Sequence, residues 1–301
     1  MPILPLATPQ PVPIYSGFDY VTVDSAHRRV YAAHSASGAL LVVDADSGLV
    51  LGQARTGPIH GVAVDPVTGH VYAGSAEQEV VEVDPQTFKV LREAPTDGPV
   101  DAIAYDPANG RIYADEDNGT RVFVIDAATF KVTSTITIPG HKPEYLAVDP
   151  VDHDLYQNIA DLSEYVEIDR DSLKVKKTVP TPELTSNHPL QYDSTYKHVL
   201  VAGKNGVLST YDDHGKLLSQ TPVQADIDQC SLDHASHILA CAGGGKLTAT
   251  LANPDGTATP LGAADVPKGV HTVGIDSKTG NLWVVWAAHD GDFVQAYSIT
   301  K

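Results

Sequence analysis

One sequence pattern recurs along the chain and constrains what it can fold into. The stretch Val62 to Ala73, which reads Val-Ala-Val-Asp-Pro-Val-Thr-Gly-His-Val-Tyr-Ala, returns in related form at Ile103 to Ala114 and at Leu146 to Gln157. Weaker copies bring the total to seven units, each anchored by an aspartate that ends an apolar segment. These anchors are Asp24, Asp65, Asp106, Asp149, Asp193, Asp233 and Asp276. A period of about 42 residues is typical of four-stranded propeller blades.

Each unit predicts four short β-strands. In the second unit we expect strands at Gly61 to Val64, Val71 to Gly74, Val80 to Val83 and Phe88 to Glu93. β-Branched and aromatic residues favour strands, whereas Asp, Pro, Gly and Asn favour the turns between them. The sequence therefore predicts an all-β fold, a seven-bladed β-propeller of four-stranded antiparallel blades. The blades are expected to start near residues 18, 59, 100, 143, 187, 227 and 270.

The two ends of the chain predict how the ring closes. The last unit stops after three strands, at Tyr297 to Thr300, while an extra segment, Ile3 to Ile14, precedes the first blade. We expect residues 1–14 to supply the missing outer strand of the last blade, which hides the edges of the sheets. Residues 1–301 would then form one domain.

Charge and hydrophobic patterning exclude several function classes. Lys+Arg 20 against Asp+Glu 38 gives a net charge of -18, which argues against nucleic acid or an anionic membrane as a partner. No apolar run approaches the roughly 18 residues of a membrane-spanning helix. The chain also shows no signal peptide, since no basic segment precedes an apolar one. Export is still compatible with a chain that starts as Met1-Pro-Ile-Leu-Pro.

Cys230 and Cys241 are the two cysteines of the chain. They fall on adjacent predicted strands of the sixth blade, close enough for a disulfide to be conceivable. Successive residues of a strand point to alternate faces of the sheet, and a count along the two strands places the two cysteine side chains on opposite faces. We therefore expect two buried thiols.

The repeat resembles the YVTN family, the surface-layer type of seven-bladed β-propeller. The resemblance rests on Val-Asp-Pro-x-Thr-Gly-x-Val-Tyr at 64–72, on its variants in other units and on third strands that end in aspartate. It covers nearly the whole chain, although the asparagine that follows the Tyr strand in the family is missing. The resemblance implies the propeller fold and an extracytoplasmic location, and it implies no particular activity.

The aligned units place acidic residues and histidines at one equivalent position. Five residues before each anchor aspartate stand Asp19, His60, Asp101, Glu144, His188, Asp228 and His271, which we name the mouth ring. The first strand of a propeller blade lines the central channel, so we expect these side chains to encircle its mouth.

The composition of the mouth ring predicts a metal site. We expect His60, His188 and His271 to converge on a divalent ion, which could be zinc, iron, copper or manganese. Asp19 and Asp228 would orient the imidazoles from behind, as carboxylates do around metal-binding histidines. Glu144 and Asp101 are candidate general bases beside a metal-activated water.

Two other interpretations of the mouth ring stay open. Protonated histidines among carboxylates could satisfy one another without a metal. Alternatively, the alignment is shifted in the divergent units, and some of these side chains point between blades.

Loops on the same face add three candidates for ligands or substrate contacts. These are His34, Glu116 and His289, the last of them followed by Asp292. The function predicted from the whole pattern is a metal-dependent enzyme, a hydrolase, lactonase or lyase, that acts as a monomer on a small molecule or carbohydrate. The alternative is a non-catalytic propeller that serves as a binding scaffold or metal carrier, and the sequence does not decide whether the protein is an enzyme.

Overall fold

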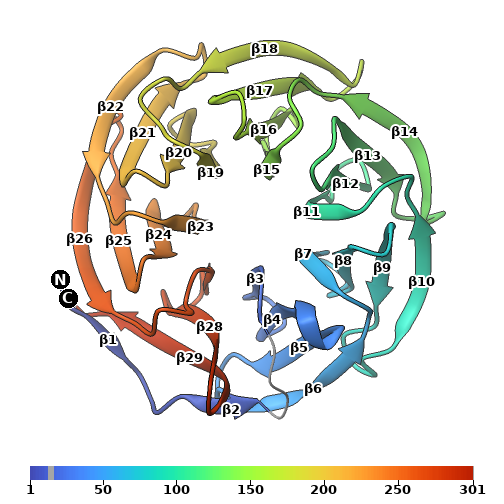
Figure 1. Ribbon diagram of the computed structural model, residues 1–301, viewed down its shortest axis with the longest axis vertical. Coiled ribbons are helices and arrows are strands. Elements are labelled where there is room, and N and C mark those ends of the chain that lie inside the picture. The colour runs from blue at the N-terminus through green and yellow to red at the C-terminus, as the bar shows by residue number, and fades with distance from the viewer. Residues whose placement is uncertain (13–16, 301) are drawn as a thin grey trace.

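The predicted propeller is confirmed by the computed structural model, which describes residues 1–12 and 17–300. The strands form seven antiparallel sheets. The sheets are arranged in a ring around a common axis (Figure 1). The only helix among the described residues is a single 3-10 turn, η1 (Ser35–Ser37). No helix in this part of the chain is long and apolar enough to cross a membrane.

The strands follow the chain from the channel outward in each blade. The inner strands are β3 (Val21–Asp24), β7 (Ile59–Val64), β11 (Val100–Asp106), β15 (Pro143–Val148), β19 (Asn187–Asp193), β23 (Ile227–Asp233) and β27 (Val273–Ile275). The second strands are β4 (Arg29–His34), β8 (Val71–Ser75), β12 (Arg111–Glu116), β16 (Leu155–Ile159), β20 (His198–Gly203), β24 (Ile238–Gly243) and β28 (Leu282–Ala288). The third strands are β5 (Ala39–Asp44), β9 (Glu79–Val83), β13 (Arg121–Asp126), β17 (Glu164–Asp169), β21 (Val207–Asp212), β25 (Lys246–Ala252) and β29 (Gly291–Ile299). The outer strands of the first six blades are β6 (Val50–Arg55), β10 (Val90–Pro95), β14 (Lys131–Thr137), β18 (Lys174–Pro180), β22 (Leu217–Pro222) and β26 (Ala258–Asp265).

The N-terminal segment closes the ring, as expected. Strands β1 (Ile3–Pro5) and β2 (Gln10–Val12) both pair antiparallel with β29, so the seventh blade takes its outer strand from the other end of the chain. The two termini consequently meet at the seventh blade (Figure 1). Residues 13 and 14 of the predicted closing segment lie outside the described residues.

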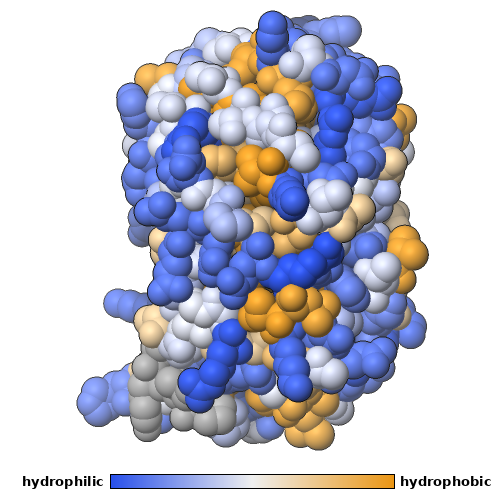
Figure 2. All heavy atoms as spheres, turned by 90° about the vertical axis from the view of Figure 1, so that its right-hand side faces the viewer, coloured by the Kyte–Doolittle hydropathy of each residue, from blue (hydrophilic) through white to orange (hydrophobic). Residues whose placement is uncertain are grey.

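The hydrophobic core is a series of layers between neighbouring blades. Tyr31, Tyr72, Tyr113 and Tyr156 occupy the same position on successive second strands, and each is at most 3% exposed. Tyr31 packs with residues of the second blade, and Tyr113 packs with residues of the fourth. The outer wall is polar by contrast. On the side shown in Figure 2 it is mostly hydrophilic, with separate hydrophobic patches.

Cys230 and Cys241 form a disulfide, so the expectation of two free thiols is wrong. The turn that begins at Asp233 pairs this residue with Ile238, and the same register places Cys230 directly opposite Cys241. Directly opposed residues of an antiparallel pair point to the same face of the sheet. Their Cα atoms are 4.1 Å apart, and the count along the strands failed because it did not include the register that this turn sets.

We predict that the closing strand stabilises the ring through its inward face. Ile3 is 3% exposed, whereas its neighbour Leu4 is 48% exposed on the same strand. Ile3→Ala should lower the free energy of unfolding by about 2 to 4 kcal/mol because it leaves a cavity. Leu4→Ala should change it by less than about 0.5 kcal/mol. Urea denaturation of both variants measures the difference, and equal effects would contradict this role of β1.

Candidate functional site

All seven residues of the mouth ring stand where the inner strands begin. His60, Asp101, Glu144, His188 and Asp228 are each the second residue of their strand. The other two, Asp19 and His271, precede β3 and β27 by two residues. The repeat alignment is therefore in register in every blade.

A β-bulge accompanies the ring residue in the five central blades. The pairing of the inner strand with the second strand shifts between Ile59 and Val62, for example, and between Val100 and Ile103. Corresponding shifts occur in β15, β19 and β23. A bulge bends the strand and re-aims the side chain that it carries. The repeat pattern gives no sign of these bulges, although they determine where the ring side chains point.

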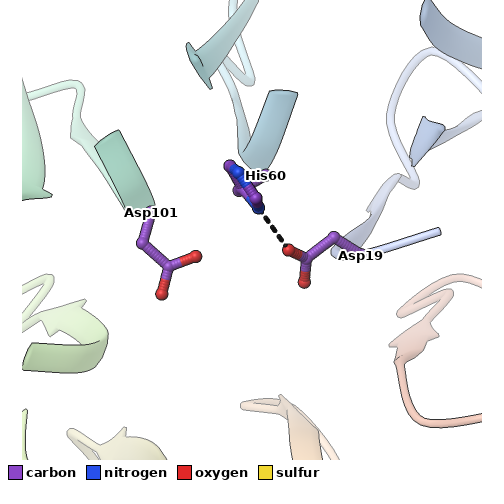
Figure 3. Close-up of side chains that lie close together, drawn as sticks. All are labelled: Asp19, His60 and Asp101. Atoms are coloured by element: carbon purple, nitrogen blue, oxygen red, sulfur yellow. Dashed lines mark hydrogen bonds and ion pairs between the residues drawn. The ribbon is translucent and has the colours of Figure 1, made fainter. Parts of the chain in front are cut away.

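Asp19, His60 and Asp101 form one close group, which we name the Asp101 cluster. The carboxylates of Asp19 and Asp101 face the same space beneath His60 (Figure 3). The Nδ1 atom of His60 lies 2.7 Å from Oδ2 of Asp19. One ligand atom from each residue lies within 4.8 Å of the other two, and no other group of three in the described chain meets this condition.

Burial and like charge act together on the acids around this cluster. Burial raises the pKa of Asp101 well above its ordinary value, and the negative charges of Asp115, Asp19 and Glu144 raise it further. Asp115 is fully buried behind Asp101, and its burial raises its pKa to about 7 despite hydrogen bonds from Gln157 and Ala102. Burial also raises the pKa of Glu144. This side of the mouth therefore holds more negative charge than it can easily accommodate.

Asp228 organises the other side of the mouth. Its Oδ2 atom lies 2.8 Å from Nδ1 of His271, and its Oδ1 lies 3.0 Å from Nε2 of His188 and 3.5 Å from Nζ of Lys204. We name these four residues the Asp228 cluster. Burial acts to raise the pKa of Asp228, but the hydrogen bonds from the two histidines outweigh it and hold the pKa far below its ordinary value.

The structure does not bring the three histidines together on the channel axis. His188 and His271 both turn to Asp228, which lies between them in the ring, and Nε2 of His188 also contacts Oε2 of Glu144 at 3.1 Å. Only His60 belongs to a group with metal-ligand spacing. Asp19 and Asp228 do contact the imidazoles of His60 and His271 through Nδ1, as expected of orienting carboxylates. Asp228 also contacts Nε2 of His188, so this imidazole is directed at carboxylates of the ring and not at the other histidines.

A small cavity of about 270 Å³ occupies the mouth. It is lined by Asp19, Tyr20, Asp101, Asp117, Asn118, Lys142, Glu144, His188, Asp228 and Gln229. Tyr20 also borders a second cavity, of about 220 Å³, deeper in the channel. Tyr145 lines this second cavity, and the centres of the Tyr20 and Tyr145 rings are 5.8 Å apart. Tyr145 has a φ of 42°, which is an unfavourable backbone conformation for a bulky residue and is often found at functional sites. Tyr20 therefore borders both cavities, and Tyr145 lines the deeper one.

The loop residues predicted to add ligands lie away from this cavity. His34 is fully buried, with its Nε2 2.7 Å from Oδ2 of Asp292 and its ring stacked on Phe18. Glu116 accepts hydrogen bonds from Arg121 and from the backbone of Thr120. His289 is exposed in the turn between β28 and β29. None of the three predicted residues lines the mouth cavity.

Comparisons with known proteins support the class of the fold, a seven-bladed β-propeller. A hydrazine synthase structure from Kuenenia stuttgartiensis is similar with a TM-score of 0.83 and 14% identity, over 96% of this chain and 97% of that one. The β-propeller domain of Cps50 (Swd1) from Myceliophteria thermophila has a TM-score of 0.78 and 13% identity, over 97% and 100% of the two chains. Such low identity supports the fold alone.

Sequence comparisons add no family. No protein-family model matches the chain, and no curated protein matches it. The resemblance to the YVTN repeat therefore stays a prediction.

We predict that His34 makes the protein less stable in acid. Burial lowers the pKa of His34 below 6.5, although Asp292 opposes this effect. The unfolded chain then binds more protons than the folded one as the pH falls through about 6.5, so stability decreases in that range. Replacing His34 by Gln should flatten the dependence of unfolding free energy on pH between 7.5 and 5, by at most about 1.4 kcal/mol per pH unit.

Urea denaturation across this pH range measures the slope for each variant. His214, whose side chain is 86% exposed, is the matched control, and His214→Gln should keep the wild-type slope. Identical slopes for wild type and His34→Gln would show that the buried imidazole does not contribute.

Proposed function

We propose that this propeller binds a divalent metal ion in the Asp101 cluster and acts on a small molecule at the channel mouth. One observation carries the proposal. The carboxylate of Asp101 is directed at Asp19 and His60, and within the described chain it has neither a hydrogen-bond donor nor a cation in contact. A half-buried carboxylate beside other acids is destabilised as an anion, and a bound cation would relieve the repulsion.

The donor set suggests which metals fit. Two carboxylates and one imidazole favour manganese, iron or zinc, whereas the softer sulfur donors that select copper(I) are missing from the Asp101 cluster. The Nδ1 atom of His60 already bonds to Asp19, so this carboxylate could orient the imidazole as well as bind.

The neighbouring residues suggest a hydrolytic or lyase reaction. A metal in this cluster would lower the pKa of a bound water or polarise a carbonyl oxygen. Glu144 lines the same cavity, and burial raises the pKa of its carboxyl group above the ordinary value, which favours its use in proton transfer. A mouth of about 270 Å³ admits a small molecule or one end of a carbohydrate.

The disulfide supports an extracytoplasmic location as part of the proposal. A disulfide that joins Cys230 to Cys241 persists in an oxidising compartment and is rare in the cytosol.

A second candidate function rests on the Asp228 cluster. His188 and His271 are already satisfied by carboxylates, which is the arrangement of a self-paired ring that needs no metal. In that case the propeller is a non-catalytic scaffold whose mouth charges hold the blades in place.

Metal titration separates the two candidates. We expect one manganese or zinc ion per chain by isothermal titration calorimetry on chelator-free protein, and at least a tenfold weaker affinity in Asp101→Asn. Asp117→Asn is the matched control because Asp117 lines the same cavity outside the cluster, and its affinity should change less than threefold. Wild-type protein that binds neither manganese, zinc, iron nor copper would leave the scaffold as the function.

Activity of the metal-loaded protein tests the catalytic part separately. On a panel of chromogenic esters and lactones, Glu144→Gln should lower kcat by about 100-fold or more if Glu144 transfers the proton. Metal content should stay unchanged in this variant, since Glu144 is not in the Asp101 cluster. A wild-type protein that binds metal but turns over none of these substrates would indicate a metal carrier.

A further inference from the structure

The mouth of the channel is divided by charge. The acidic side consists of Asp19, Asp101 and Asp117, which all line the cavity. Asp19 and Asp101 have His60 as their neighbour. On the opposite side, basic groups surround the two remaining carboxylates of the ring, Glu144 and Asp228. This second side is unusual in a chain with a net charge of -18, because its lysines and histidines gather at one place.

On the basic side, N–H donor side chains outnumber the carboxylates. The carboxylate of Asp228 contacts His188, His271 and Lys204. The carboxylate of Glu144 contacts His188 and lies 3.8 Å from Nζ of Lys142. Two carboxylates are therefore shared among four basic side chains. Both carboxylates are also held in place, since Glu144 is 7% exposed at the start of β15 and Asp228 stands at the bulge of β23.

The two lysines are placed to contact a ligand as well as the protein. An ammonium group has three N–H donors. Nζ of Lys204 has one carboxylate neighbour, at 3.5 Å, and Nζ of Lys142 has one at 3.8 Å, among the described residues. Their side chains are 40% and 51% exposed, and Lys142 lines the mouth cavity, so both ammonium groups are solvated and can exchange water for an anion.

A second hollow lies beside the Asp228 cluster. A groove of about 520 Å³ between the sixth and seventh blades is lined by Asp226, Asp228, Gly244, Gly245, Lys268, Val270 and His271. Asp228 lines both hollows, so each of them adjoins the Asp228 cluster. The groove contributes a further lysine, Lys268, and enough space for the remainder of a molecule whose charged group lies at the mouth.

We propose that the ligand of this site is a small organic anion whose carboxylate group binds Lys204 and Lys142. In this arrangement the carboxylate lies on the basic side, and the reactive part of the molecule reaches across the mouth to the metal in the Asp101 cluster. The assignment of the reactive part rests on the proposed function, whereas the carboxylate contact rests on the two lysines alone. Repulsion from Asp19 and Asp101 would reject the reverse orientation in the absence of metal.

Glycolate is a suitable probe because it carries one carboxylate and one hydroxyl group on two carbons. We expect glycolate to bind the full chain by isothermal titration calorimetry, weakly without metal and at least fivefold more tightly when manganese is present. Ethylene glycol, which lacks the carboxylate, should not bind. Lys204→Met and Lys142→Met should each weaken glycolate binding at least fivefold and leave manganese affinity within twofold of wild type.

Lys278→Met provides the matched control. Lys278 is exposed in the turn between β27 and β28, next to the anchor Asp276 and at the other end of the blade. This variant should bind glycolate as the wild type does. Circular dichroism and thermal melts of the three variants establish that each is folded before titration.

The outcomes distinguish this inference from the proposed metal site. If manganese binds but glycolate binding is missing or insensitive to both lysine variants, the carboxylate site is overturned and the metal site stands. If glycolate binds through Lys204 and Lys142 while no metal binds, the metal site fails and the anion site stands. Loss of glycolate binding in Lys278→Met as well would indicate nonspecific attraction and would also overturn the inference.

Discussion

A buried carboxylate at the turn between the first two strands is the interaction on which the rest of the structure depends. In the second blade, Asp65 accepts hydrogen bonds from the backbone of Val67 at 2.9 Å and from the hydroxyl of Thr68 at 2.7 Å. Such a turn sets the register of the hairpin, since it determines which residue begins the return strand. The register in turn determines which residue of the inner strand reaches the opposite end of the channel.

The same carboxylates also connect neighbouring blades. Nδ1 of His153 in the fourth blade lies 3.1 Å from Asp106 of the third, and Nδ1 of His237 lies 2.7 Å from Asp193 one blade earlier. Each anchor thus holds its own hairpin and, in these blades, the adjacent one. The relative placement of the ring residues therefore follows from contacts at the far face of the propeller, where no candidate site lies.

The repeat makes the blades, the closing strand and the positions of the mouth ring predictable from sequence. Each of these features can be located by counting residues from an anchor aspartate, because the pattern is periodic. Which carboxylate each imidazole selects was not predictable, because this depends on bulges that the pattern does not show. Burial of His34 was equally hidden, since its partner Asp292 comes from the far end of the chain. The pairing of Cys230 with Cys241, in contrast, follows from the turn at Asp233 once its register is known.

Ring closure by the N-terminal segment also imposes an order on synthesis. Ile3 is made long before Ile299, its partner in the sheet. While a ribosome extends the chain, the early blades have no closed ring to join, and the first strand must wait unpaired until the seventh blade emerges. Contacts between such distant residues also slow folding, because the loop between them must be ordered before they form. A nascent chain of this propeller thus carries an unpaired strand until β29 has been made. The excess of acidic residues keeps the chain soluble during this time.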